Sequence, residues 1–362
     1  MPATQYELPL VRRYAGAAVI PRLALCSGPT PVQRIEVPDS FGVGALWVKH
    51  DDLSGHVYGG NKVRKLEFLL GQALAERRRA VITFGALGSN HVLATATYGA
   101  AAGLEVHAVL TPQASTPYLR TNLLADLAAG AMLHPVPSFD DVLRRAVEIR
   151  SELRERDGVD PLVIPFGGTS PGGTLGFVNA AFELADQVEA GELPEPDLVY
   201  VPLGSMGTSV GLAAGFAAAG MKTTVVGVRV VPDAIGNEEL LGRVLGDVVA
   251  EMRAVGPSFP ALQRSDINLE LRQGFFGEGY AIPTCEGRAA LEAAAQWGLR
   301  LENTYTGKAL AALFADGSAG ALCDKTVLFW NTYNSRPLDP PSASAANVPD
   351  ALRPYLDEGE LT

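Results

Sequence analysis

Short apolar runs alternate with longer amphipathic stretches along most of this chain, and this alternation restricts the fold more than any other feature. The apolar runs are expected to be β-strands over residues 46–50, 81–84, 106–110, 132–136, 162–166, 198–202, 224–231 and 327–330. The stretches between and after them are expected to be α-helices. The first runs from residue 61 to near 79, and the second follows the loop at 85–88 and ends at 102. The others span 118–128, 140–156, 175–189, 209–219, 238–254, 286–297 and 307–316. Repeated strand–helix units predict an α/β fold with open, largely parallel sheets that helices cover on both faces.

The loops that follow the expected strands are the places to look for a site. In open parallel sheets, ligands bind beyond the C-terminal ends of the strands. Glycine-rich or polar loops follow Phe84, Phe166, Pro202 and Trp330. We therefore expect the functional site at this edge. Residues 1–45, interrupted by prolines, are expected to be irregular.

Composition narrows the class of protein. The 362 residues are 47% hydrophobic and 19% charged, which is typical of a well-buried soluble chain with one large domain or two. A net charge of −11 argues against a nucleic-acid or anionic-membrane partner, and no apolar run is long enough to cross a bilayer.

The cysteines and the chain ends add to this picture. Cys26, Cys285 and Cys323 are far apart without a CxxC pair, which argues against disulfides and against a metal site and favours a reducing cytoplasm. The apolar stretch at 15–20 is too short for a secretory signal. A Pro-, Ser- and Ala-rich segment over 337–346 is expected to lie on the surface.

The stretch YGGNKVRKLE at residues 58–67 is the first candidate for a reactive site. Two glycines let the backbone turn and approach a ligand closely. Asn61 is expected to be the N-cap of the next helix, so Lys62 would project from its first turn, with Lys65 on the same face. Because cations are disfavoured at a helix N-terminus, two lysines there indicate an anion site, and a partly desolvated lysine can be a nucleophile. A solvated surface lysine is the alternative.

Two more strand-to-helix loops could bind a ligand. The loop GSMGTS at 204–209 offers backbone N–H and hydroxyl groups at a helix start, which suit a phosphate, but its spacing is neither that of a P-loop nor that of a dinucleotide site. Ser89, Asn90 and His91 open another helix and form a donor cluster for a carboxylate or a ring hydroxyl. A tight turn and an ordinary N-cap are the structural alternatives.

Tyr305 and Tyr280 lie in loops and are aromatic candidates, although each alone is equally typical of a core. Thr306 is expected to be the N-cap of the helix that follows. The stretch GTSPG at 168–172 matches a hydrolase nucleophile elbow. That interpretation is disfavoured because the five histidines all precede Ser170, whereas such a hydrolase needs its histidine later in the chain.

Together these stretches resemble the D-cysteine desulfhydrase and 1-aminocyclopropane-1-carboxylate (ACC) deaminase family. The likeness spans residues 20–335 and rests, in unchanged order, on GGNKVRKLE at 59–67, GSNH at 88–91, GGTLGFVNA at 172–180, GSMGT at 204–208 and YTGK at 305–308. The family consists of pyridoxal-phosphate (PLP) enzymes of the tryptophan synthase β-like fold, fold type II. The resemblance implies two open, twisted, mostly parallel sheets, a large PLP-binding domain over 1–65 and 164–362, and a small domain over 66–163.

The resemblance also implies roles for individual residues. Lys62 would be the Schiff-base lysine and the base for the substrate Cα proton. Asn90 would bond the pyridoxal 3′-oxygen, and Thr306 would face the pyridine nitrogen. The remaining implied roles are phosphate binding by Lys65, Gly204, Ser205, Met206, Gly207 and Thr208, substrate binding by Ser89, Asn90, His91 and Thr332, and catalysis at the reacting carbons by Ser89, Tyr280 and Tyr305.

The implied reaction is β-elimination from a small amino acid. PLP is a sink for the electrons left at Cα after deprotonation. A hydroxyl group facing the ring nitrogen does little to keep that nitrogen protonated, and we infer that the weaker sink favours quick loss of a β-leaving group over transamination. The expected products are a 2-oxo acid and ammonia, with sulfide when the substrate is D-cysteine.

The desulfhydrase branch fits better than the ACC deaminase branch. ACC deaminases carry a Glu where this chain has Thr306 and a Leu where it has Thr332. The family's usual Gly pair after that threonine is replaced by Tyr333 and Asn334. These side chains are expected to narrow or re-line the cavity beside the ring, so another substrate, such as a cysteate-type amino acid, stays open.

Three alternatives remain at this point. The first is ACC deaminase-like ring opening or another PLP-dependent β-elimination, β-replacement or racemisation. The second is a PLP-bearing, amino-acid-binding protein without turnover, and the third, least supported, is a Rossmann-type dehydrogenase. The resemblance further implies a homodimer.

Overall fold

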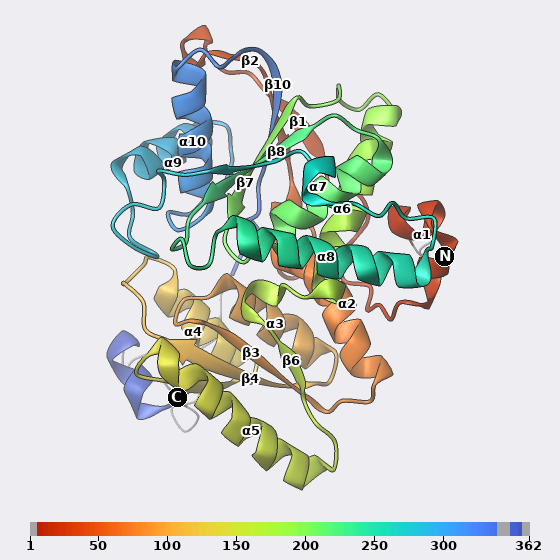
Figure 1. The fold of residues 1–362 in the computed structure, drawn as a ribbon. Helices are drawn as coiled ribbons and strands as arrows, with labels where there is room; N and C mark the ends of the chain where they lie inside the picture. Colours follow the sequence, from red (N-terminus) through yellow and green to blue (C-terminus); the bar gives the residue numbers. More distant parts are fainter. Residues whose placement is uncertain (1–5, 339–347, 357–362) are drawn as a thin grey trace, which may run out of the picture.

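Two β-sheets organise the part of the chain that the computed structural model describes, residues 6–338 and 348–356 (Figure 1). The larger sheet has the strand order β1-β2-β10-β7-β8-β9, and the smaller has the order β5-β4-β3-β6. β1 is antiparallel to β2, and the other pairings between the described strands are parallel. The predicted fold class, two open and mostly parallel sheets flanked by helices, is confirmed. Most of the Pro-rich segment over 337–346 lies outside the described residues.

The elements alternate along the chain much as the pattern predicts. The strands are β1 (Val32–Ile35), β2 (Val43–Lys49), β3 (Ala80–Ala86), β4 (Glu105–Thr111), β5 (Met132–Pro135), β6 (Leu162–Ile164), β7 (Leu198–Leu203), β8 (Thr224–Arg229), β9 (Leu269–Arg272) and β10 (Leu322–Trp330). The helices are α1 (Pro9–Arg13), α2 (Asn61–Ala75), α3 (Asn90–Ala101), α4 (Leu119–Ala128), α5 (Val142–Asp157), α6 (Pro171–Glu189), α7 (Gly207–Ala219), α8 (Glu238–Val255), α9 (Cys285–Gln296) and α10 (Thr306–Ser318).

The sequence pattern misses two strands, β1 and β9. Both lie at the edges of the larger sheet, and each has only one fully buried residue, Ile35 in β1 and Leu269 in β9. Such short, half-exposed strands lack a continuous apolar run, which is the signal that predicts a buried parallel strand. The expectation that residues 1–45 are irregular is therefore wrong for β1 and also for the short helix α1.

Helices cover both faces of the larger sheet because successive residues of its strands point to opposite sides. Val199 and Val201 of β7 pack in one apolar cluster with α6, α7 and α8. Tyr200 of the same strand packs in a second cluster with α9 and α10. In Figure 1 this sheet forms the upper half of the molecule.

The smaller sheet forms the lower half and has the same layered construction (Figure 1). Val81 of β3 packs in a cluster with α2, α3 and α4, and its neighbour Ile82 packs in another with α5. Val348, Leu352 and Leu356 of the C-terminal segment belong to the first of these clusters. The C-terminal segment therefore packs on the smaller sheet, although it follows the last strand of the larger one.

A buried cluster of charges fixes the start of α2. The Arg64 guanidinium donates to both oxygens of Asp51 (2.7–3.0 Å) and to both oxygens of Glu183 (2.9 Å each). Lys49 at the end of β2 also donates to Glu183, at 2.7 Å. Although burial raises the pKa of Glu183, the charges of Arg64 and Lys49 hold it well below its usual range. These bonds join α2 to β2 and α6, two residues after Lys62.

In the described ranges, no helix is both long and apolar enough to span a bilayer. The same ranges contain no group of three or more His, Cys, Asp or Glu side chains arranged to hold a metal ion.

Candidate active site

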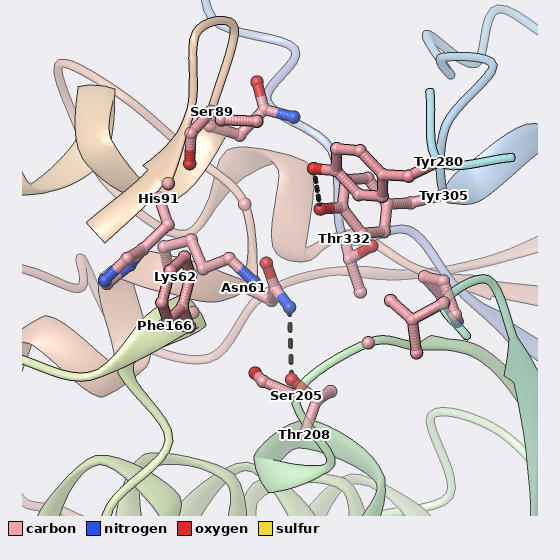
Figure 2. A pocket seen from close by; sticks show the side chains of 18 of the residues that line it. Asn61, Lys62, Ser89, His91, Phe166, Ser205, Thr208, Tyr280, Tyr305 and Thr332 are labelled. Carbon is pink, nitrogen blue, oxygen red and sulfur yellow. Dashed lines mark hydrogen bonds between the residues drawn. The ribbon is translucent and has the colours of Figure 1, made fainter. Parts of the chain in front are cut away.

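A cavity of 410 Å³ lies between the two sheets, at the C-terminal ends of their strands. Side chains that point into it come from the start of α2, from α3, from the start of α7 and from the loops before α10 and after β10 (Figure 2). The predicted site residues among its lining are Lys62, Ser89, Asn90, His91, Gly204, Ser205, Met206, Thr208, Tyr280, Tyr305 and Thr332. Within the described part of the chain, Lys65, Gly207 and Thr306 are not among the lining residues.

Glycine is required at the turn that presents Lys62. Gly60 has φ +93°, and a Cβ atom there would lie 2.7 Å from the Thr332 carbonyl oxygen. The expectation that Asn61 is the N-cap is wrong, because Gly60 takes that position and Asn61 is the first helical residue. The freed Asn61 amide instead donates to the Thr208 hydroxyl at 3.1 Å (Figure 2). Lys62 projects from the first turn, as predicted.

Burial makes the Lys62 ammonium easier to deprotonate than that of an exposed lysine. Burial lowers the pKa of Lys62 from 10.5 to about 8, while the charge of Glu302 acts in the opposite direction. Because an amine attacks only when it has lost its proton, this shift makes Lys62 a much better nucleophile than an exposed lysine.

Lys65 lies behind the cavity wall. Its ammonium donates to the Gly167 carbonyl and to the Thr169 hydroxyl, both at 3.0 Å. Burial, followed by the nearby charge of Lys62, lowers the pKa of Lys65 well below its ordinary value. The Thr169 hydroxyl is in turn 2.7 Å from the Ser205 hydroxyl, so a chain of two hydrogen bonds connects Lys65 to Ser205 in the cavity wall.

The loop before α7 has the chemistry of an anion site. The Gly207 amide donates to the Ser205 carbonyl (2.9 Å) across Met206, whose φ of +70° and ψ of −37° form a γ-turn. A side chain in this backbone region costs about 1–2 kcal/mol, which the burial of Met206 in the core offsets. After this turn, the amides of Thr208 and Ser209 at the start of α7 have no intrahelical partners, and Thr208 lines the cavity.

Two further observations show that this loop fits a phosphate. Ser205 and Thr208, the two hydroxyl residues that flank Met206 and Gly207, line the cavity. A Cβ atom on Gly207 would lie 2.7 Å from the Thr169 hydroxyl and 2.9 Å from the Lys65 ammonium, so glycine keeps this space open. Hydroxyl groups, helix-start amides and a nearby lysine together match a phosphate ester.

The Ser89–Asn90 turn faces the loop before α7 across the cavity. Ser89 is the N-cap of α3 and accepts from the Val92 amide at 3.3 Å. The Asn90 carbonyl oxygen accepts from Asn122 (3.1 Å) and from the Tyr58 hydroxyl (3.4 Å), so its amide group is oriented by both. The helix start and these two side chains can hold a carboxylate or a ring oxygen.

His91 lines the cavity from α3, but its imidazole turns toward β3. The ring points away from Tyr280 and Tyr305 (Figure 2), is buried, and lies 3.1 Å from the Thr83 hydroxyl of β3. Burial, and then the charges of Lys62 and Lys65, lowers the pKa of His91 well below its usual value, so the ring is neutral. The neutral ring carries no positive charge for a carboxylate, whereas the His91 backbone amide lies at the start of α3.

Tyr280 and Tyr305 form one hydrogen-bonded pair on the cavity wall. Their hydroxyl oxygens are 2.5 Å apart, and their rings meet edge to face (Figure 2). Burial raises the pKa of Tyr280 to about 12, and burial with the neighbouring Tyr280 raises that of Tyr305 well above its usual value. Both hydroxyl groups therefore carry their protons at neutral pH and can donate them.

Thr306 is not the N-cap of α10 and does not face the cavity. Tyr305 takes the cap position, and the fully buried Thr306 hydroxyl accepts from the Glu302 amide at 2.8 Å. Thr332 does line the cavity, close to the turn at Gly60. Of the two threonines, Thr332 is the one whose position allows contact with a ligand.

Glu302 is the residue that sequence reasoning misses. It lines the cavity, and its carboxylate accepts from the amides of Thr304, Tyr305 and Thr306 at 2.7–2.9 Å. An acidic residue just ahead of a helix start favours capping, and that signal was available in the sequence. The carboxylate thus stabilises the α10 terminus and also supplies the negative charge beside Lys62.

A cavity that joins a lysine of lowered pKa to a phosphate cradle defines the class of protein. The chain matches the family of pyridoxal-phosphate-dependent enzymes over residues 23–332 and belongs to that family. The groups in the cavity match those that PLP needs: an amine for its aldehyde and a helix terminus for its phosphate. PLP is therefore the cofactor, as predicted.

Individual relatives narrow the branch of the family. The chain is 36% identical to nocardicin C-9′ epimerase of Nocardia uniformis subsp. tsuyamanensis over 327 residues, which cover 88% of this chain and 94% of the relative. It is 36% identical to D-cysteine desulfhydrase of Klebsiella pneumoniae over 306 residues, covering 81% and 87%. A crystal structure of an ACC deaminase homologue superposes with a TM-score of 0.75 at 32% identity, covering 90% of this chain and 94% of that one. These comparisons confirm the predicted resemblance.

Proposed function

We propose that this protein is a PLP-dependent lyase of the D-cysteine desulfhydrase type, which eliminates a β-substituent from a small amino acid. The products would be a 2-oxo acid and ammonia, with sulfide when the substrate is D-cysteine. The observation that carries the proposal is the position of Lys62, whose amine has a pKa of about 8 on the wall that it shares with the phosphate cradle and the tyrosine pair. The D-cysteine desulfhydrase relative supports the reaction type.

The residues of the chain divide the work as follows. Lys62 would hold the cofactor covalently and afterwards take the substrate Cα proton on Nζ. Gly204, Ser205, Met206, Thr208 and the start of α7 would bind the phosphate, with Lys65 and Gly207 behind them. When bound, PLP supplies the sink for the electrons of the broken Cα–H bond.

The opposite wall would bind the substrate. Ser89, the Asn90 amide and the backbone amide of His91 would hold the substrate carboxylate, and Asn90 would also reach the 3′-oxygen of the cofactor. The Tyr280 hydroxyl, which carries its proton at neutral pH, would give that proton to the departing sulfur. Tyr305 would hold the Tyr280 hydroxyl in place through their 2.5 Å bond.

We propose Thr332, in place of Thr306, as the hydroxyl group that faces the pyridine nitrogen. Thr332 lines the cavity, whereas the Thr306 hydroxyl is engaged with Glu302. A neutral hydroxyl group at the pyridine nitrogen fits the β-elimination proposal, because it does little to keep that nitrogen protonated. The Glu302 carboxylate does not replace it, because backbone amides of the α10 terminus already occupy both of its oxygens.

An assay of the purified protein with D-cysteine, L-cysteine, ACC and D-serine tests the reaction. We expect sulfide and pyruvate from D-cysteine, and no product when Lys62→Ala is used. Lys222→Ala, at an exposed lysine outside the cavity, is the matched control and should keep full activity. Absence of sulfide from D-cysteine in the wild-type protein would refute the named substrate, and absence of a cofactor absorbance band would refute the PLP assignment.

Epimerisation is the second candidate reaction, because a relative equally similar to this chain is an epimerase. It needs the same Cα proton transfer but no leaving group. Chiral analysis of each amino acid after incubation in D₂O separates the two reactions. Deuterium at Cα with loss of enantiomeric purity and no 2-oxo acid indicates epimerisation, and 2-oxo acid indicates elimination.

We further propose that residues 66–163 form a small domain that closes over the substrate against a large domain of residues 1–65 and 164–362. The smaller sheet, from Ala80 to Ile164, supports this division. We also propose a cytoplasmic homodimer, which light scattering of the purified protein tests for the oligomeric state.

A further inference from the structure

A second cavity, of 260 Å³, adjoins the first. Tyr58, Glu302 and Asn334 each line both cavities, so the partition between them is one residue thick. The Tyr58 ring is buried in an apolar cluster, and its hydroxyl makes one long bond, 3.4 Å to Asn90.

The second cavity is built by side chains where the resemblance leads us to expect glycine. Tyr333 does not line the first cavity, contrary to the expectation that it narrows the space beside the cofactor ring, but it lines the second. Its ring lies 6.2 Å from that of Tyr118. The neighbouring Asn334 is held by the Gly59 amide at 2.7 Å and the Arg336 amide at 3.0 Å. Tyr333 therefore lines a new compartment, whereas Asn334 also re-lines the first cavity, as expected.

Arg300 gives the second cavity its charge. Its guanidinium lies 5.6 Å from the centroid of the Tyr333 ring and makes a long contact, 3.5 Å, with the Arg336 carbonyl. Over residues 6–338 and 348–356, no carboxylate forms an ion pair with it. Glu302 lines the same cavity, but the α10 amides take both of its oxygens. Contacts with the Tyr333 side chain and the Arg336 carbonyl use part of the exposed Arg300 guanidinium, and its other N–H groups are available for a planar oxyanion.

The rest of the lining suits a polar ligand group. Tyr118, Thr121, Asn122 and Asn303 contribute hydroxyl and amide groups. The Asn122 amide bonds to Asn90, so the wall that would hold the substrate carboxylate in the first cavity continues into the second. A ligand anchored at Asn90 therefore lies next to this compartment.

We propose that the second cavity receives the end of the substrate side chain and that Arg300 selects amino acids whose side chain ends in a carboxylate or another oxyanion. This inference rests on the proposed function, because it takes the substrate α-carboxylate to be held at Ser89 and Asn90. The side chain would pass from the first cavity into the second beside Tyr58, Glu302 and Asn334, which line both. Arg300 is then a specificity residue that contacts the distal group and takes no part in proton transfer at Cα.

Matched acid–amide pairs test the proposal. Aspartate with asparagine, and glutamate with glutamine, differ in distal charge at nearly constant size, and each is used in both enantiomers. The apparent dissociation constant is measured on the holoenzyme from the absorbance change of the bound cofactor. We expect at least one acid to bind about fivefold to tenfold more tightly than its amide, with the preference falling as salt is added.

Variants then show whether Arg300 causes the preference for the acid over its amide. Arg300→Gln should abolish the acid preference while leaving amide binding unchanged, and Arg300→Lys should keep part of it. Arg243→Gln, which removes the same charge from an exposed position on α8, should keep all of it. Equal binding of acid and amide by the wild-type protein, or an acid preference that survives Arg300→Gln, overturns the proposal. If no amino acid perturbs the cofactor absorbance at all, the proposed function fails as well, so the two failures are distinguishable.

Discussion

Lys62 should titrate more than two pH units below an ordinary lysine, and this can be measured without any substrate. Burial lowers its pKa from 10.5 to about 8. At pH 7 a group with a pKa of 8 is about 9% neutral, whereas a group with a pKa of 10.5 is about 0.03% neutral, a difference of about 300-fold in reactive amine. A lysine that reacts at neutral pH is what attachment of an aldehyde cofactor requires.

The assay is competitive acylation of the cofactor-free protein. A limiting amount of an amine-selective anhydride is added across pH 6 to 11, and the acylated fraction of each lysine is read from peptide mass spectra. We expect the acylation of Lys62 to be half-maximal near pH 8. The exposed Lys222 provides the internal reference for an ordinary amine.

Substitution of Glu302 gives a second test, because the expected direction of the change in the Lys62 pKa is known. Its charge raises the pKa of Lys62 against the effect of burial. Glu302→Gln removes that charge but keeps an oxygen for the α10 amides, so the half-maximal pH of Lys62 should move lower. A half-maximal pH equal to that of Lys222, or an upward movement in Glu302→Gln, would refute the electrostatic argument for the site.

Three further variants test the packing around the site. Glu302→Ala should lower the free energy of unfolding in urea by about 2 kcal/mol, because three backbone amides lose their acceptor, and a stability equal to wild type would contradict the capping role. Gly207→Ala should weaken PLP binding in equilibrium dialysis by about tenfold or more, since a methyl group would fill the phosphate cradle, and unchanged affinity would place the phosphate elsewhere. Arg64→Met should cost about 3–5 kcal/mol at pH 7, because it strands buried carboxylates. The lowered pKa of Glu183 means that its stabilisation is present above the usual carboxylate range and is lost as the pH falls, so the cost of Arg64→Met should shrink in acid, and a cost that grows in acid would contradict this assignment.

Much of the fold was predictable because the strands carry their own signal. β3, β4 and β7 are buried on both faces and read as continuous apolar runs. The edge strands β1 and β9 do not, because each has only one buried residue among four. Local chemistry likewise predicted that Lys62 lies in the first turn of a helix behind two glycines.

The errors at the site come from backbone geometry and long-range packing. Asn61 could not cap α2 because Gly60, with φ +93°, occupies the turn that the cap needs. The family pattern places Thr306 next to the tyrosine but cannot show which way its hydroxyl points, and the hydroxyl pairs with Glu302. The second cavity joins Tyr118, Arg300 and Tyr333, which are more than 30 residues apart in sequence at every step, so no local pattern could predict it.

The buried ion pairs of Arg64, two residues after Lys62, determine to which half of the molecule the reactive amine is attached. Arg64 ties the first turn of α2 to β2 and α6, so the amine is mounted on the frame of the six-stranded sheet. Ser89 and Asn90 instead lie where α3 begins, directly after β3 of the four-stranded sheet. Any hinge between the halves would therefore move Ser89 and Asn90 relative to Lys62, while the bonds of Arg64 keep Lys62 fixed to the larger sheet.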